Sequence, residues 1–373
     1  MPTDARLSPR VRILNIARLF NLLEGVDLLT TDVTAGRTWL LQMNAGALQS
    51  GVPIQFCMAY PRHALQSLEM SQVTQIRASD DHVPSNGDFA TSHQWRIGYS
   101  SLFAWSIGIG PFKDGWYSTN VQPGGSVGNS PELSPALQGA ISTLSAGPVA
   151  PGDGIGFSDA SLILRSCTTG GRLLQPSRAA TAIDAGFRAR VWGASAGPMG
   201  EVYATRSVVS GWLFHHVLAA AMGAPFNLAP ADLAPMDAEL SPTPPPDASG
   251  RVAYALNTTS LSPETLVVRA WTATAPIALI KSAEPIFELW HTAPVFANGW
   301  AVLGEISKWV PVATARIAWI DENSAGVSVS LTGEAGEAIS FVFWSAGSGA
   351  VTVSCVLDAA GKAVASVPAA TCM

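Results

Sequence analysis

Apolar residues in the first part of the chain fall alternately into helix-length and strand-length runs. Residues 32–51 carry apolar side chains at helical spacing up to a Ser-Gly stop, and residues 52–58 form a compact run of strand length. Residues 61–70 begin with proline and predict a second helix, and residues 73–77 predict a second short strand. This alternation repeats about four times, which predicts βα units and a parallel sheet. Upstream, leucines at helical spacing predict a helix over residues 11–26.

From residue 161 onward the pattern changes to short strand-like runs separated by glycine and proline. Residues 325–331, AGVSVSL, alternate with period two, as expected of a strand with one buried and one solvated face. Residues 224–250 are rich in Pro, Ala and Asp and predict an extended connection. We therefore expect an N-terminal segment of residues 1–30, an α/β region of residues 31–160 and an all-β region of residues 161–373 that contains this connection.

Composition and charge argue against a nucleic-acid partner and against a membrane-spanning helix. Charged residues make up 13% of the chain, against an average of about 25%, and the net charge is −6 with no basic run. A nucleic-acid surface needs clustered Lys and Arg to displace counterions, so we expect no nucleic-acid partner. No apolar segment reaches the ~20 residues of a membrane-spanning helix, and the N-terminus has no signal-peptide pattern. The compartment stays unknown.

The four cysteines lie at positions 57, 167, 355 and 372, far apart in the sequence, and form no CxxC pair. This spacing indicates neither a structural zinc site nor a disulfide framework. The cysteines therefore do not identify the compartment either.

The richest chemistry of the α/β region follows the predicted strand 73–77. The strand ends at Arg77, and Ser79, Asp80 and Asp81 follow in the loop. Parallel α/β folds place their active sites at this carboxyl end of the strands. Neighbouring charges and partial burial tune a carboxyl for acid-base work, so Arg77 and the two aspartates are a candidate sugar-binding and proton-donating cluster. The alternative interpretation is a polar turn that Arg77 caps.

Three motifs in order give this region a family resemblance. FCMAY at residues 56–60 is followed one βα unit later by QVTQIRASDD at residues 72–81, and after an aromatic-rich helix SAGPV at residues 145–149 precedes Asp153. Over about residues 32–184 the chain resembles the raffinose synthase and alkaline α-galactosidase group of glycoside hydrolase family 36. The resemblance implies a (β/α)₈ barrel followed by an antiparallel β-sandwich, and retaining cleavage or transfer of α-galactosyl groups. The implied partner is an α-galactoside or related oligosaccharide, and neither a metal nor an organic cofactor is implied.

The resemblance also implies roles for individual residues. Asp81, the last residue of an R-x-x-x-D pattern, would be the general acid/base, with Asp80 as the alternative, and Arg77 would bind a sugar hydroxyl. Further residues near strand ends could line the sugar pocket: Cys57, Asp114, Trp116 and Asp153. For Cys57 the role of a small buried apolar residue is equally open. His82 and His93 could contact sugar hydroxyls, although loop histidines are commonly solvated.

A retaining glycosidase needs a second carboxylate about 5 Å from the acid, as nucleophile. Relatives carry it on a strand shortly before the segment that begins near Asp32. Here residues 17–26, ARLFNLLEGV, occupy that place, and the nearby acids Glu24 and Asp27 lie in a helical pattern. We therefore expect the C-terminal half of a (β/α)₈ TIM-type barrel followed by an antiparallel β-sandwich domain, in a truncated protein that is weakly active or inactive.

A second interpretation is a non-catalytic carbohydrate-binding protein that uses the C-terminal β region. Sugar faces pack on indole rings, and six of the twelve tryptophans lie from residue 271 onward: Trp271, Trp290, Trp300, Trp309, Trp319 and Trp344. Apolar neighbours flank most of them, which favours a place in the core.

Overall fold

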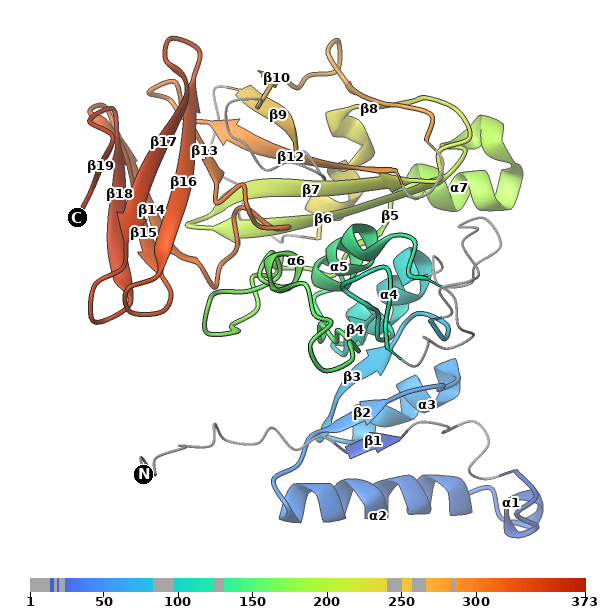
Figure 1. The fold of residues 1–373 in the computed structure, drawn as a ribbon. Coiled ribbons are helices and arrows are strands. Elements are labelled where there is room, and N and C mark those ends of the chain that lie inside the picture. Colours follow the sequence, from blue (N-terminus) through green and yellow to red (C-terminus); the bar gives the residue numbers. More distant parts are fainter. Residues whose placement is uncertain are drawn as a thin grey trace, which may run out of the picture.

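The computed structural model combines an α/β region, built on a parallel sheet, with several antiparallel sheets that follow it (Figure 1). It describes residues 14–16, 19, 24–82, 97–123, 131–239, 250–256, 266–282 and 286–373. Two sequence-based expectations, His93 and most of the polar loop after Asp81, fall outside these ranges.

The parallel sheet has the order β1-β2-β3-β4, and every neighbouring pair is parallel. Its strands are β1 (Leu14–Ile16), β2 (Ile54–Phe56), β3 (Val73–Arg77) and β4 (Gly110–Phe112). The helices of this region are α1 (Leu28–Thr31), α2 (Ala35–Gln49), α3 (Pro61–Gln66), the 3₁₀ turn η1 (Ser67–Glu69) and α4 (Ile97–Ser106). The predicted βα alternation is confirmed, but the described strands form an open sheet and not a closed barrel.

The helix expected over residues 11–26 is wrong where the structure describes it. Leu14–Ile16 form strand β1, which pairs in parallel with β2 and buries Ile16 to 6% exposure. Helical spacing of leucines is a weak signal over so short a segment, and pairing with the edge of an apolar sheet overrides it.

The largest antiparallel sheet has the order β10-β9-β12-β7-β6-β5. Its strands are β5 (Thr181–Ala182), β6 (Glu201–Val209), β7 (Trp212–Ala220), β9 (Gly250–Leu256), β10 (Val268–Ala270) and β12 (Phe287–Val295). A two-residue turn of Ser210 and Gly211, both at positive φ, joins β6 to β7 and matches the twist of a tight hairpin. All nine residues of β7 are buried, because other elements cover both faces of the sheet.

Helices and short strands cover this sheet. On one side α5 (Pro135–Leu144) lies between the parallel sheet and the long strands β6 and β7 (Figure 1), and eight of its residues are buried. The remaining elements of this part are α6 (Ala160–Ile163), α7 (Asp184–Trp192), η3 (Ala194–Ala196), β8 (Phe226–Leu228), η4 (Pro230–Asp232), α8 (Ala234–Asp237) and β11 (Ile277–Leu279). Strand β8, η4 and α8 lie within the predicted Pro-rich connection, of which residues 240–249 are not described.

Two small antiparallel sheets complete the chain. One is β13-β16-β17 and the other β14-β15-β18-β19. Their strands are β13 (Trp300–Gly304), β14 (Ile317–Asn323), β15 (Gly326–Thr332), β16 (Ala338–Ser345), β17 (Gly349–Val356), β18 (Lys362–Val367) and β19 (Thr371–Cys372). A disulfide between Cys355 of β17 and Cys372 of β19 joins the two sheets. The expectation that cysteine spacing indicates no disulfide is therefore wrong.

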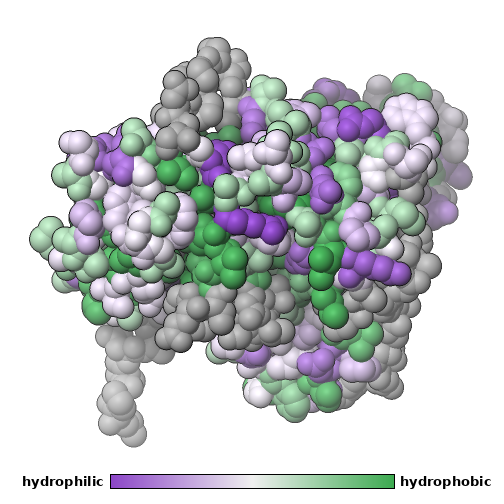
Figure 2. Space-filling view, turned by 90° about the horizontal axis from the view of Figure 1, so that it is seen from above, coloured by the Kyte–Doolittle hydropathy of each residue, from purple (hydrophilic) through white to green (hydrophobic). Residues whose placement is uncertain are grey.

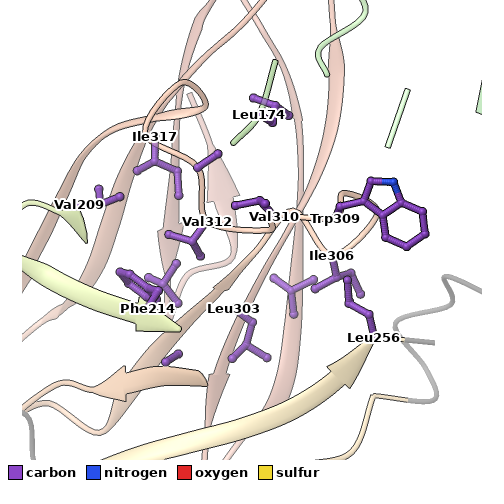
Figure 3. Packing of buried hydrophobic residues seen from close by; sticks show 14 of the residues in the cluster. Leu174, Val209, Phe214, Leu256, Leu303, Ile306, Trp309, Val310, Val312 and Ile317 are labelled. Atoms are coloured by element: carbon purple, nitrogen blue, oxygen red, sulfur yellow. The ribbon is translucent and has the colours of Figure 1, made fainter. Parts of the chain in front are cut away.

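The apolar interior is divided. A large core runs from α5 through the antiparallel sheets, and Figure 3 shows part of it, where Trp309, Val310 and Val312 pack between strands. A separate core, which includes Leu40, Ile54, Phe56 and Ile76, lies in the parallel-sheet region. The face seen from above shows hydrophobic patches separated by hydrophilic side chains (Figure 2). None of the helices that the structure describes combines the length and apolar character of a membrane span.

Candidate functional site

The candidate site lies where strands β3 and β4 end. The amide of Ala78, just after β3, donates a hydrogen bond to the carbonyl of Phe112, the last residue of β4, at 2.9 Å. Because the strands are parallel, the loops that follow them leave the same edge of the sheet side by side. Residues 78–82 and 113–114 therefore meet at this edge of the sheet.

Arg77 is the centre of this cluster. Its Nη1 lies 2.7 Å from Oδ1 of Asp81 and 3.3 Å from Oδ1 of Asp114. The arginine side chain is only 7% exposed, whereas Asp81 is 57% and Asp114 30% exposed. Burial acts to lower the pKa of Arg77, but Asp114, Cys57 and Asp81 outweigh burial, so its pKa is raised. The guanidinium thus remains a fixed positive charge beneath two accessible carboxylates.

Asp114 also links the two loops through backbone groups. Its Oδ2 accepts a hydrogen bond from the amide of His82 at 2.8 Å, and its own amide donates to Oγ of Ser79 at 2.8 Å. Ser79 is buried, and its hydroxyl also donates to the carbonyl of Asp80 at 3.2 Å. These contacts fix the position of Asp114 relative to Arg77. Asp80, which the sequence offered as the alternative to Asp81, is exposed.

A buried polar pair lies behind the strand ends. Nε2 of His82 is 2.5 Å from Oε2 of Glu132, and both side chains are almost completely buried. Lys113 is 1% exposed, and its Nζ donates to the carbonyl of Asp114 at 3.2 Å. Burial lowers the pKa of Lys113 to about 8, against the opposing attraction of Glu132 and Asp114. His82, expected as a loop residue facing sugar or solvent, is instead an interior residue.

Cys57 follows β2 and lies half-buried beside the cluster. Burial raises the pKa of its thiol; Arg77 acts to lower it, while Asp114 and Asp81 raise it further. The thiol is therefore within electrostatic reach of all three charged residues, and the structure brings Cys57 together with them.

Trp116 and Asp153 have other surroundings. Trp116 is 1% exposed and packs so closely on α5 that a Cβ at Gly139 would lie 3.0 Å from its ring. Asp153 accepts hydrogen bonds from the amide and hydroxyl of Ser118, at 2.7 and 2.6 Å, and from the Gln122 amide group at 2.9 Å. Trp116 is therefore a core residue. Asp153 stabilises the loop after β4 through its hydrogen bonds with Ser118 and Gln122.

Among the residues that the structure describes, the neighbouring strand ends offer no well-placed carboxylate that could act as a nucleophile opposite Asp81. Strand β1 exists, contrary to the expectation for this segment, but it ends in the buried Ile16. Asp114 lies near Asp81, yet both carboxylates bind the same nitrogen of Arg77. An anomeric carbon cannot lie between them while the guanidinium is there. No group of three metal-ligating side chains is found within the described ranges.

The six tryptophans from residue 271 onward differ in burial. Trp271 and Trp309 are buried, and Trp290, Trp300 and Trp344 are partly buried. Trp319 of β14 is 58% exposed.

Sequence reasoning missed Glu132 and Lys113. A lysine directly after a three-residue apolar strand was a signal of burial near Asp114, but nothing local connects Glu132 with His82, fifty residues away.

No protein-family model matches the chain, and a search of curated proteins found no match either.

Proposed function

We propose that this chain binds an α-galactoside or a related oligosaccharide at the ends of β3 and β4. In this proposal Arg77 binds a sugar hydroxyl, Asp81 is the acid/base carboxyl and Asp80 is the alternative acid. The parallel sheet would be the C-terminal half of a (β/α)₈ barrel, and the small antiparallel sheets would form a β-sandwich. Asp114 and Cys57 would line the sugar site.

One observation carries the proposal: a buried guanidinium that binds an exposed and a partly exposed carboxylate at the carboxyl ends of parallel strands. Sugar hydroxyls both donate and accept hydrogen bonds. Carboxylates accept and a guanidinium donates hydrogen bonds, so the cluster offers both kinds of partner within a few ångströms. Asp81 is the more exposed of the two carboxylates, as a group that transfers a proton to a glycosidic oxygen must be.

We expect binding with little or no turnover. Retaining hydrolysis needs a nucleophile on the opposite face of the sugar from the acid. Strand β1 ends in Ile16, and Asp114 shares a guanidinium nitrogen with Asp81. Loss of the covalent route leaves the remaining groups to hold the sugar without an efficient displacement.

Calorimetric titration with methyl α-galactoside and hydrolysis of an aryl α-galactoside test the proposal together. Wild type should bind, Arg77→Met should weaken binding by about tenfold or more, and any slow hydrolysis should vanish in Asp81→Ala. Asp80→Ala tests the alternative acid: hydrolysis lost in this variant and kept in Asp81→Ala would assign the acid role to Asp80. Absence of binding by wild type would refute the proposed site. Fast hydrolysis that requires Asp81 would refute the expectation of low turnover.

A second candidate function is carbohydrate binding by the C-terminal sheets, and the exposed ring of Trp319 favours it. Trp319→Ala separates the two: lost sugar binding in this variant, with full binding in Arg77→Met, would favour the second function.

A further inference from the structure

The residues that hold the site in place include two that the proposed function does not use, Glu132 and His82. Glu132 lies just before α5, and Asn120 holds its backbone: the Glu132 amide donates to the Asn120 carbonyl, and the Asn120 side-chain amide donates to the Glu132 carbonyl. Its Oε1 accepts from the amide of Ser134 at 3.2 Å, which leaves Oε2 for His82. The carboxylate is thus fixed from several sides before it meets the imidazole.

His82 connects the buried carboxylate of Glu132 to Asp114 in the site. Its ring is bound to Glu132, and its own backbone amide donates to Oδ2 of Asp114 at 2.8 Å. Oδ1 of Asp114 in turn contacts Arg77, which binds Asp81. One continuous chain of contacts therefore runs from the buried carboxylate of Glu132 to the exposed carboxylate of Asp81.

We propose that the Glu132–His82 pair positions Asp114, and through it Arg77, for the ligand. The inference rests on the proposed function for the identity of that ligand. Glu132 and His82 are positioning residues: both are buried, and they act on the site through the His82 amide. Ser79 accepts from the Asp114 amide on the other side, so Asp114 is held at its backbone and at both side-chain oxygens.

The reactivity of the Cys57 thiol can be used to detect the position of Asp114 in the absence of sugar. Arg77, Asp114 and Asp81 all act on the pKa of Cys57, so a displaced Asp114 changes the pH at which the thiol becomes reactive. Of the other cysteines, Cys167 is buried and Cys355 and Cys372 form the disulfide. Peptide mass spectrometry after pulses of iodoacetamide therefore follows Cys57 separately.

Glu132→Gln keeps the shape of the side chain but removes the charge that binds His82. If the pair positions Asp114, the pH midpoint of Cys57 alkylation should fall, because a displaced Asp114 no longer raises the pKa of the thiol. Affinity for methyl α-galactoside should fall about tenfold in the same variant. Glu69→Gln is the matched control, since Glu69 forms a surface ion pair with Arg37 in the same region. An unchanged Cys57 midpoint in folded Glu132→Gln would overturn the inference.

A second experiment leaves the buried residues Glu132 and His82 unchanged. Coupling between two sites is reciprocal, so neutralising the half-exposed Asp114 in Asp114→Asn should shift the ring ¹⁵N signals of His82 in histidine-labelled protein. Unchanged His82 signals would overturn the inference even if Glu132→Gln did not fold. A wild type that binds no sugar while both shifts occur would refute the proposed function and leave the positioning role supported.

Discussion

The buried charge of Lys113 should make the stability of this protein rise with pH in a defined window. Lys113 is completely enclosed, and its pKa falls from 10.5 to about 8 on folding because of burial. Each pKa unit corresponds to about 1.4 kcal/mol, so holding the charged amine inside costs the folded state about 3 kcal/mol. Glu132 and Asp114 offset part of the burial cost, and that offset is already contained in the lowered pKa.

The direction follows from proton binding. Because the folded pKa is the lower one, the unfolded chain binds more protons between about pH 8 and 10.5, and the free energy of unfolding increases with pH there. Below about pH 8 the full cost is present. In Lys113→Met the cost is absent at every pH. The advantage of this variant over wild type should therefore shrink by about 3 kcal/mol between pH 7 and 10.5.

Urea denaturation of both proteins at intervals from pH 7 to 10.5, followed by circular dichroism, measures this difference. Other groups that titrate in the range cancel in the comparison. Lys281→Met, at an exposed lysine, is the control and should follow wild type at all pH values. Parallel stability curves for wild type and Lys113→Met would refute the reasoning, because they would mean that Lys113 has the same pKa in the folded and unfolded chains.

Two further predictions concern residues outside the buried cluster. Asp153→Asn should destabilise the protein by about 1–3 kcal/mol in urea denaturation, because hydrogen bonds from Ser118 and Gln122 lose their charged acceptor, but sugar affinity should stay unchanged. A loss of affinity without a loss of stability would instead make Asp153 a ligand contact. Replacing both Cys355 and Cys372 by alanine should lower the free energy of unfolding by about 3 kcal/mol, the chain-entropy value for a sequence separation of 17. Equal stability of the double variant and the oxidised wild type would contradict this.

Local sequence pattern was sufficient for much of the parallel-sheet region. The helix from Ala35 and the strands at residues 54–56 and 73–77 lie where periodicity, proline and glycine predicted them, since those signals act over a few residues. Strand β1 was missed, because three residues among regularly spaced leucines become a strand only by pairing with β2. The expectation of half a (β/α)₈ barrel came from resemblance, and no local pattern encodes how such a sheet would close.

In the site, too, contacts between residues close in the sequence could be predicted, and contacts between distant residues could not. The contact of Arg77 with Asp81 spans four residues and could be predicted. The disulfide could not, because Cys355 and Cys372 approach only when the strands around them have paired. Likewise, the burial of His82 depends on Glu132, which the fold brings from a distant loop.

The separate core of the parallel-sheet region has a consequence for how long the site stays assembled. Arg77 ends a strand of the smaller core, whereas Glu132 lies immediately before α5, which belongs to the larger one. Folding units with separate interiors open independently, so a transient opening of the parallel-sheet unit would separate these residues while the antiparallel sheets stayed intact. A ligand bound at the closed site would oppose that opening by mass action. Amide hydrogen exchange in β2 and β3 would then slow in proportion to occupancy, which makes the smaller core a sensor of binding.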